Sequence, residues 1–561
     1  MTVESNHVCQ PRDYKLIVEK DVQVPTRDGA ILYADVFRPD GGGERFPAIM
    51  NVSVYQKDKL WIPPGDLEEK PNPYMNWETA NPLWWCPRGY ALVRVDARGS
   101  GKSPGQSEPS SYQEALDFYD AIEWIAKRPW CSGNIGTLGI SYHAASQWRL
   151  ANLQPPSLKA ILPWEGRADQ YRDQVYHGGI FAMGFMSNWH TTQTAHHLLG
   201  KSRSYNPDAF HNDLLWQYMS HNLDSEYWRM CSARWEKITV PLYSAGNWTS
   251  FALHLRGNTE AFMLAASKHK KLRIHSGTHF HAFYSEEGRM DQLRWFDYWL
   301  KGIDTGIMAE PPVKLEIRTG GGKGRYEFRF ENEWPIARTQ WSKMYLKIER
   351  EPSGHADATE GRLAATPPQD SAKLTYSAGG GSVAAHGHSG AGRAGVSFET
   401  PPMEQETEIT GPIVLALWVS STSEDMDIYA TLRNIGPDGK NMFEVGSQSQ
   451  PVPLTKKWLR TSHRKLDPER SLPYRPYHAH DERWWLKPGE PVECQVEIWP
   501  TSIVLGKGHR LRLDIQPRDG VGSAPYTHYQ ADYNLGAENT IYAGGDKASY
   551  LLLPVIPPKK S

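Results

Sequence analysis

The sequence predicts an α/β domain that is interrupted by a helical insertion and followed by an all-β domain. Three observations carry this prediction. Short apolar runs alternate with helical segments from residue 15 to about 165 and again from 236 to 335, as in βα units. Residues 167–235 are aromatic, rich in histidine and helical in period. After about residue 335, runs of period two are separated by Gly, Pro and Asp turns, which indicates a β-sandwich or jelly roll.

The first α/β segment contains candidate strands that are almost continuously apolar. FPAIMNVSVY (46–55) and YALVRVDARG (90–99) are typical of parallel strands buried on both faces. YQEALDFYDAIEWIAKRP (112–129) carries apolar residues at helical spacing and predicts an amphipathic helix. NIGTLGIS (134–141) and LKAILPWEG (158–166) predict two further strands.

The α/β pattern resumes after the insertion, with the strand ITVPLYSAGNW (238–248) and the helix HLRGNTEAFMLAAS (254–267). The strand KLRIHSGTH (271–279) and the amphipathic helix DQLRWFDYWLKG (291–302) follow. The predicted domains are an α/β domain of residues 1–166 and 236–335, a helical cap of residues 167–235, and a jelly-roll domain of residues 336–561.

Charge and composition restrict the partners. The 561 residues contain 62 Lys and Arg against 64 Asp and Glu, so no overall field attracts nucleic acid or an anionic membrane. The expected ligand is therefore a small molecule without high charge. The oligomeric state is left open, a homo-oligomer included.

Neither a targeting segment nor a metal motif is evident. The N-terminus has no apolar core of a signal peptide, and no run of about 18 apolar residues occurs, which predicts a cytoplasmic protein. The five cysteines are odd in number, scattered and without CxxC spacing, which argues against disulfides and zinc. No metal and no cofactor is expected.

The stretch LGISYHAA places Ser141 between a predicted strand and a predicted helix. This context matches a nucleophile elbow, in which a strained turn exposes the serine Oγ and the next backbone N–H holds an oxyanion. The second position after the serine is usually glycine but is His143 here, so crowding at the turn is an objection. The alternative is that Ser141 is an ordinary helix N-cap.

Several motifs together resemble the cocaine-esterase-like and X-Pro dipeptidyl-peptidase-like serine hydrolases. They are DARGSGKSPG, GISYHAASQW, PWEGRAD, GTHFHAFY and, in the all-β region, GPIVLALWVSS, LRTSHRKLD and GHRLRLDI. The resemblance covers roughly residues 18–555 and implies an α/β-hydrolase domain with a cap and a C-terminal jelly roll. By resemblance, Ser141 is the nucleophile, and the backbone N–H of Tyr142 and the hydroxyl of Tyr55 form the oxyanion hole. Tyr55 is otherwise an ordinary tyrosine at a strand end.

The strand KLRIHSGTH and the residues after it offer three histidines as the base. A base must reach Oγ from the loop after the last strand, so His275, inside the strand, is expected in the core or a second layer. His279 falls at the position that the resemblance implies, with His281 as the alternative. His143 is expected to pack or to line the substrate pocket, together with Trp164 and Trp248.

The expected acid is missing. In the resembled family the aspartate follows the strand before the histidine strand, and here that position is Thr249, in SAGNWTSF. The fold also tolerates an acid at the end of the strand after the nucleophile helix, which here ends in Glu165. The predicted triad is therefore Ser141, Glu165 and His279. The alternative is that Glu165 pairs with Arg167 or Arg172, or anchors the cap.

The leading functional prediction is a serine hydrolase that cleaves an ester or amide of a small, largely apolar substrate through an acyl-enzyme. One alternative is an X-Pro dipeptidyl-peptidase or amino-ester hydrolase, which needs an acidic cluster for a substrate ammonium; Asp169, Asp173 and Asp224 are present without forming a distinctive motif. The others are an acyltransferase using the same acyl-enzyme and a degenerate, non-catalytic binding protein.

Overall fold

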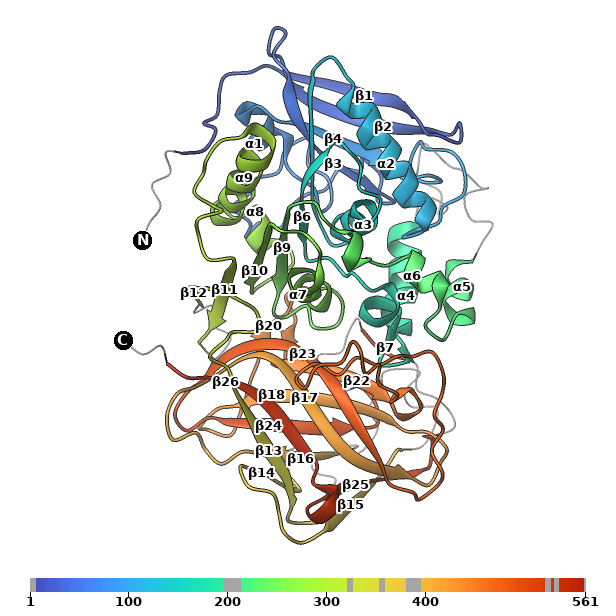
Figure 1. Cartoon of the computed structure of the whole chain (residues 1–561), viewed down its shortest axis with the longest axis vertical. Helices are drawn as coiled ribbons and strands as arrows, with labels where there is room; N and C mark the ends of the chain where they lie inside the picture. Colours follow the sequence, from blue (N-terminus) through green and yellow to red (C-terminus); the bar gives the residue numbers. More distant parts are fainter. Residues whose placement is uncertain are drawn as a thin grey trace.

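The computed structural model describes residues 7–195, 213–319, 326–352, 359–379, 395–519, 526–528 and 534–558. The chain forms two parts, an α/β part drawn in the upper half of Figure 1 and an all-β part in the lower half. This order confirms the fold class that the sequence predicts.

The α/β part is built on a mixed sheet with the strand order β1-β2-β4-β3-β5-β6-β9-β10-β11-β12. Its strands are β1 (Leu16–Pro25), β2 (Ile31–Pro39), β3 (Phe46–Ser53), β4 (Ala91–Asp96), β5 (Cys131–Ile140), β6 (Leu158–Trp164), β9 (Leu242–Asn247), β10 (Lys270–His275), β11 (Val313–Arg318) and β12 (Tyr326–Glu331). All neighbours between β4 and β11 pair in parallel. The carboxyl ends of these strands therefore share one edge, where ligands of open α/β sheets bind.

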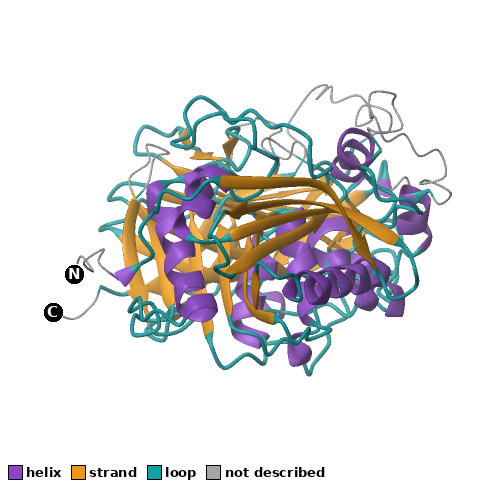
Figure 2. Ribbon diagram, turned by 90° about the horizontal axis from the view of Figure 1, so that it is seen from above, coloured by secondary structure: helices purple, strands orange, loops and turns teal. Residues whose placement is uncertain are grey.

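Helices cover both faces of this sheet because its strands are apolar on both sides (Figure 2). In β3, for example, Met50 shares one hydrophobic core with Phe118 of α2. Ile49, on the opposite face of the strand, shares another core with Phe296 of α9. The helical elements of this part are α1 (Pro82–Trp85), η2 (Cys86–Arg88), α2 (Tyr112–Ala126), α3 (Tyr142–Ala151), η7 (Trp235–Lys237), α7 (Leu255–Leu264), α8 (His281–Tyr284) and α9 (Glu286–Lys301).

The insertion between β6 and β9 is largely helical. Its described elements are η3 (Gln170–Val175), β7 (Tyr176–His177), β8 (Ile180–Phe181), α4 (Met183–Trp189), η4 (His190–Thr194), α5 (Leu214–Ser220) and α6 (Glu226–Met230). The short antiparallel pair β7–β8 was not predicted, since two-residue strands leave no periodic signal. The insertion covers the carboxyl edge of the parallel strands.

The C-terminal part is all-β apart from short 3₁₀ turns in its described residues. Its elements are β13 (Gln340–Ile348), β14 (Gly361–Ala364), β15 (Ala372–Ser377), β16 (Val396–Glu399), β17 (Thr407–Ser421), β18 (Asp427–Ile435), β19 (Asn441–Met442), β20 (Glu444–Val445), β21 (Pro451–Val452), β22 (Thr455–Arg460), η9 (Thr461–His463), β23 (Val492–Leu505), β24 (Arg510–Gln516), β25 (Glu538–Ala543), η11 (Gly545–Lys547) and β26 (Tyr550–Ile556). Alternate residues of these strands enclose a separate core of Leu, Ile and Val side chains. β12 pairs in the first sheet and β13 in the second, so the chain passes between the two parts from Glu331 to Gln340.

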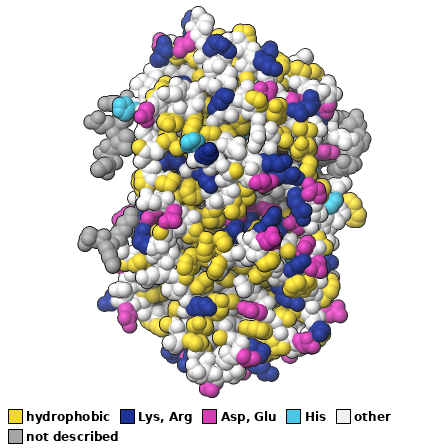
Figure 3. Space-filling view, in the orientation of Figure 1, with side chains coloured by type: hydrophobic (Ala, Val, Ile, Leu, Met, Phe, Trp, Pro, Cys, Tyr) yellow, Lys and Arg dark blue, Asp and Glu magenta, His cyan; other side chains and the backbone are white. Residues whose placement is uncertain are grey.

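On the face drawn in Figure 3, basic and acidic side chains alternate with apolar ones over both parts. This agrees with the near-balance of charges in the sequence. Among the described residues, no helix is long and apolar enough to cross a membrane.

Candidate active site

Ser141 lies in a sharp turn between β5 and α3. Its backbone has φ 57° and ψ −109°, a left-handed conformation that costs free energy for a residue other than glycine. The Ser141 side chain makes no capping hydrogen bond to α3, so Ser141 does not act as an ordinary helix N-cap. A Cβ on Gly139 would lie 2.5 Å from the Cβ of His143, so the missing side chain of Gly139 makes room for His143. The turn thus accommodates the departure from the usual motif.

The imidazole in contact with Ser141 belongs to His254, at the start of α7. The Oγ atom of Ser141 lies 3.2 Å from Nε2 of His254. Nδ1 of the same ring lies 2.9 Å from the hydroxyl of Ser250 and 3.6 Å from Oε2 of Glu165. A proton on Nδ1 can be donated to Ser250, which leaves the Nε2 lone pair facing Ser141. Burial lowers the pKa of His254 to about 4, despite the opposing effect of Glu165.

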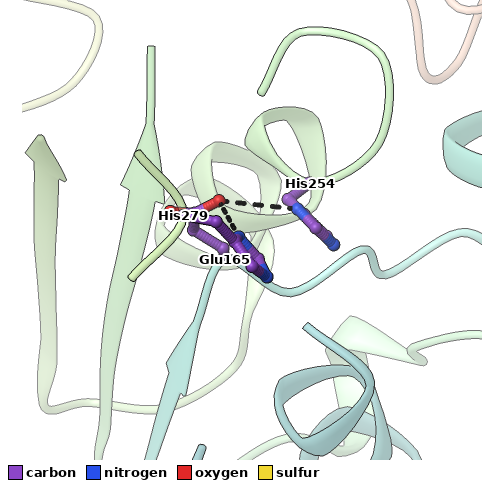
Figure 4. A group of neighbouring side chains, drawn as sticks. All are labelled: Glu165, His254 and His279. Atoms are coloured by element: carbon purple, nitrogen blue, oxygen red, sulfur yellow. Dashed lines mark hydrogen bonds and ion pairs between the residues drawn. The ribbon is translucent and has the colours of Figure 1, made fainter. Parts of the chain in front are cut away.

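Glu165 follows the last residue of β6 and is fully buried. One of its oxygens lies 2.7 Å from Nδ1 of His279, and the other lies 3.1 Å from Nε2 of His275 and 3.1 Å from the amide nitrogen of Asn247. Burial would raise the pKa of Glu165, but the surrounding imidazoles hold it well below its usual range. Figure 4 shows this carboxylate with the neighbouring rings of His254 and His279.

His279 lies in the loop beyond β10, as the sequence predicts, but its ring is held between two carboxylates. Nδ1 faces Glu165, and Nε2 lies 3.0 Å from Oε1 of Glu78. Burial opposes a charge on this ring, yet the two glutamates together raise the pKa of His279 to about 10. The predicted pairing of Glu165 with His279 is therefore present, whereas the predicted contact of His279 with Ser141 is made by His254. His281 is exposed, and His275 is buried behind Glu165.

The two predicted oxyanion donors lie beside the serine. The hydroxyl of Tyr55 is buried, lines the cavity and accepts a hydrogen bond of 2.9 Å from the indole N–H of Trp189. No described residue accepts its proton, and burial raises its pKa, so it remains a donor. The backbone N–H of Tyr142 belongs to the first turn of α3 and has no acceptor within the helix. The phenol of Tyr142 points elsewhere and bonds Glu114.

A cavity of about 420 Å³ opens onto Ser141, His254 and His279. Its further lining includes Tyr55, Trp77, Glu78, Arg167, Gln174, Phe185, Trp189, Leu253, Phe280 and Tyr526. Aromatic and apolar side chains lie among polar ones, which also include Asp66, Asn188, Gln193 and Gln448, and this mixture suits a small organic ligand.

The three residues predicted to line this cavity are not among those that do, and this corrects the prediction. His143 is buried, with its ring 5.8 Å from that of Tyr55. Trp164 lies within the sheet against the ring of His275, and Trp248 donates its indole N–H to a backbone oxygen of Glu316. Trp164 and Trp248 are core residues, because the strands at whose ends they lie are covered by other elements on both faces.

Sequence reasoning missed His254 and Glu78. The signal for His254 was present, since the helix HLRGNTEAF follows β9 and therefore begins at the same sheet edge as Ser141. The expected group at that place was an acid, and a histidine was not considered. Glu78 lies in a loop with no periodic pattern, and nothing in the sequence singles it out.

Glu165, His254 and His279 also form a group that could hold a metal ion, since one ligand atom from each lies within 4.8 Å of the others. Two imidazoles and a carboxylate suit zinc. The same atoms already satisfy one another, and the carboxylate stands hydrogen-bonded to His279. The sequence-based expectation of no metal stays a prediction.

The elbow serine, the adjacent imidazole and the covered sheet edge define the class of an α/β-hydrolase that uses serine. Comparisons with known proteins agree with this class. Residues 28–281 match the X-Pro dipeptidyl-peptidase (S15 family), and residues 305–552 match the X-Pro dipeptidyl-peptidase C-terminal non-catalytic domain. A CocE/NonD family hydrolase from Staphylococcus aureus is 30% identical, with a TM-score of 0.86 over 97% of this chain and 94% of its own.

More distant relatives extend along nearly the whole chain. The cocaine esterase of Rhodococcus sp. is 24% identical over 96% of this chain and 98% of its own length. A putative serine esterase of Mycobacterium bovis is 25% identical, covering 95% of each chain. An α-amino acid ester hydrolase with 15% identity and a TM-score of 0.67 shares the fold. The chain belongs to the CocE/NonD family of hydrolases, and it is a serine hydrolase.

Proposed function

We propose that this enzyme hydrolyses an ester of a small molecule through an acyl-enzyme on Ser141, with His254 as the general base and Glu165 as the acid that supports it. The observation that carries the proposal is the 3.2 Å contact between Oγ of Ser141 and Nε2 of His254 at the wall of the cavity. That distance suits the transfer of the hydroxyl proton to the ring.

In the first step, Oγ attacks the ester carbonyl while its proton passes to Nε2 of His254. The carbonyl oxygen becomes an oxyanion, which the backbone N–H of Tyr142 and the phenol of Tyr55 stabilise. The tetrahedral intermediate collapses as the alcohol leaves with the proton from His254. A water molecule then attacks the acyl-enzyme in the same manner and releases the acid and Ser141.

The protonation states favour His254 over His279 as the base. A base must be neutral to accept a proton, and burial keeps the pKa of His254 at about 4. The pKa of His279 is raised to about 10 by Glu165 and Glu78, with both ring nitrogens directed at carboxylates, so this ring is a cation at neutral pH. We assign His279⁺ the role of fixing Glu165 in place.

Glu165 lies 3.6 Å from Nδ1 of His254, longer than a hydrogen bond but near enough to stabilise an imidazolium. Hydrogen bonds of catalytic groups are often loose before substrate binds and tighten in the complex. This placement supports an active enzyme over a degenerate binding protein.

The alternative of an X-Pro dipeptidyl-peptidase or amino-ester hydrolase finds less support. Of the three candidate carboxylates for a substrate ammonium, Asp169 and Asp224 form ion pairs with Arg172, and Asp173 forms one with Arg256. These acids are neutralised within the protein, and none of them lines the cavity at Ser141.

A fluorophosphonate probe, followed by peptide mass analysis and ester turnover, tests the proposal. We expect the probe to add its phosphonyl group to Ser141, with loss of fluoride. Ser141→Ala should lower kcat by about a million-fold while the melting temperature is retained. Ser146→Ala, which removes another buried hydroxyl of α3, is the matched control and should keep both labelling and turnover. Folded protein that is not labelled at Ser141 would support the binding-protein alternative.

A further inference from the structure

Arg167 is a buried cation at the substrate cavity. It follows Glu165 by two residues, is 3% exposed and lines the same cavity as Ser141. Among the described lining residues it is the one lysine or arginine. The charge of Arg167 contributes to the low pKa of His254, after burial and the neighbouring His279, so it acts within range of the reacting atoms.

The partners of Arg167 are neutral. Its Nε donates to the side-chain oxygen of Gln170 over 3.1 Å, and its Nη2 donates to the hydroxyl of Ser110 over 3.0 Å. Its guanidinium carbon also lies 5.5 Å from the ring centre of Tyr142. In the part of the chain that the structure describes, no carboxylate forms an ion pair with Arg167, and its Nη1 has no hydrogen-bond acceptor.

Two buried arginines on neighbouring elements are each neutralised by an acid. Arg149 pairs with Glu114 at 2.8 Å, and Arg172 pairs with Asp224 at 2.9 Å. Burying a charge without a counterion is costly, and the two hydrogen bonds of Arg167 do not require a charged donor. The uncompensated guanidinium is therefore better explained by an anion that arrives with the ligand than by anchoring of the cap.

A group without hydrogen-bond partners among the described residues comes from the same segment. Gln174 is 1% exposed and lines the cavity, yet neither its amide nitrogen nor its amide oxygen has a hydrogen-bond partner among the described residues. Leaving a buried amide unpaired costs about 1 to 3 kcal/mol, which a ligand can recover by accepting its N–H. Arg167 and Gln174 thus offer a charged and a neutral donor to one cavity.

We propose that Arg167 and Gln174 bind a carboxylate of the substrate, so that the preferred substrate is an ester with an apolar body and one anionic end. A monoester of a dicarboxylic acid and an ester of a hydroxy acid both have this chemistry. A single guanidinium matches one negative charge, which favours a carboxylate over a phosphate dianion. The inference rests on the proposed ester hydrolysis at Ser141 and specifies its substrate class.

Two pairs of esters that differ only in the anionic end test the inference. In the acyl arm, monoethyl adipate is compared with ethyl hexanoate; in the alcohol arm, 4-acetoxybutyrate is compared with butyl acetate. kcat/KM is measured by pH-stat titration. We expect the anionic ester to be preferred at least tenfold in one arm, and that arm identifies which side of the ester carries the carboxylate.

Variants of Arg167 and Gln174 test which residue causes the preference for the anionic ester. Arg167→Met should lower the anionic-to-neutral ratio of kcat/KM about 10- to 100-fold, as expected for the loss of a charge-assisted hydrogen bond. Arg167→Lys should keep part of the ratio, and Gln174→Leu should lower it less. Arg229→Met removes the same charge from an exposed site of the cap and is the control, with an unchanged ratio. Melting temperature and fluorophosphonate labelling check the fold of each variant. If Arg167→Met does not fold, the ratios measured for Arg167→Lys and Gln174→Leu test the inference.

An anionic preference that Arg167→Met leaves intact would overturn the inference, as would a wild-type enzyme with no preference in either arm. In both cases, turnover of the neutral esters or labelling of Ser141 keeps the proposed hydrolase function. Failure to hydrolyse all four esters together with failure to label Ser141 would instead reject that function.

Discussion

Two buried clusters of charge meet at the start of helix α7 and differ in how their charges are compensated. His254 belongs to the proposed catalytic cluster with Ser141, Glu165 and His279. Two residues further along, Arg256 belongs to a second cluster that joins the α/β part to the all-β part.

The second cluster, termed the Arg256 cluster, consists of Arg256, Asp173, Glu260, Arg475 and Glu497. Arg256 lies 3.2 Å from Asp173 and 3.0 Å from Glu497, and Arg475 bonds Glu260 at 2.5 Å. Every member has a partner of opposite charge, and arginine keeps its proton throughout the accessible pH range. Its ion pairs connect the α/β part, the insertion and the all-β part.

The catalytic cluster uses imidazoles where the Arg256 cluster uses guanidinium groups. Glu165 is shared by three rings. Despite burial, two carboxylates raise the pKa of His279 to about 10, whereas burial lowers the pKa of His254 to about 4. Imidazole can take or release a proton near neutral pH, so its charge can follow the reaction. We infer that the ion pairs of the Arg256 cluster hold the parts together, whereas the incomplete pairing of His254 leaves a ring nitrogen that can accept a proton.

Among the variants that test this comparison, His254→Gln should cause the largest loss of activity. Loss of the base should lower kcat by about a million-fold, because Oγ then has no group to receive its proton. His279→Gln is the matched variant and should cause a smaller loss, since it removes support for Glu165. Steady-state kinetics with a p-nitrophenyl ester measure both, and the reverse order of effects would make His279 the base.

The pH profile separates the two histidines independently. A base works when deprotonated, so with His254 as base, kcat/KM should stay level below neutrality and fall only near its pKa of about 4. With His279 as base, activity would instead rise up to its pKa of about 10. Circular dichroism at each pH confirms that the enzyme remains folded over the measured range.

Glu165→Gln comes next in size. Removal of the buried charge should lower kcat by about ten-thousand-fold, as loss of a triad acid does elsewhere, because the imidazolium of His254 is no longer stabilised. Ser141 should still react slowly with the fluorophosphonate, and thermal unfolding should show a folded protein. A near-normal kcat would leave Glu165 as a residue that only positions His279.

Tyr55→Phe should have a smaller effect that falls on kcat. A donor aimed at the oxyanion contributes about 3 to 4 kcal/mol in the transition state, which corresponds to a loss of about 100- to 1,000-fold. KM should change little, since the ground-state carbonyl is held less strongly than the oxyanion. If kcat is unchanged and only the melting temperature falls, Tyr55 serves solely to pack against Trp189.

The smallest effect on catalysis should come from breaking the Arg256 cluster. Glu497→Gln leaves the buried Arg256 without one of its counterions, a mostly buried carboxylate, and should lower the free energy of unfolding by about 3 kcal/mol. Glu226→Gln, which breaks an exposed pair with Arg234, is the control and should cost less than about 1 kcal/mol. Urea unfolding measures the loss; a large drop in kcat without loss of stability would contradict the division between the two clusters.

Much of the fold could be predicted because local periodicity reports burial. The apolar runs at 46–55 and 134–141 predicted strands that the structure places side by side as β3 and β5. The position of Glu165 at a strand end brought it to the edge where His279 also lies, and their contact of 2.7 Å has the geometry that the sequence-based triad requires. The roles of these residues stay predictions until the variants are measured.

The sequence by itself determined the class of the enzyme, the order of its parts and the placement of Ser141, Glu165 and His279 at one sheet edge, since strand direction fixes which loops meet there. Only the tertiary structure decided which histidine reaches Ser141. His254 is 113 residues away along the chain, and its ring meets Oγ because α7 packs against β9, where the hydroxyl of Ser244 donates to the backbone oxygen of Asn258. Such contacts depend on side-chain packing between distant segments, which no local pattern encodes. The tertiary structure also decided the surroundings of Arg167, whose guanidinium group has only neutral hydrogen-bond partners among the described residues.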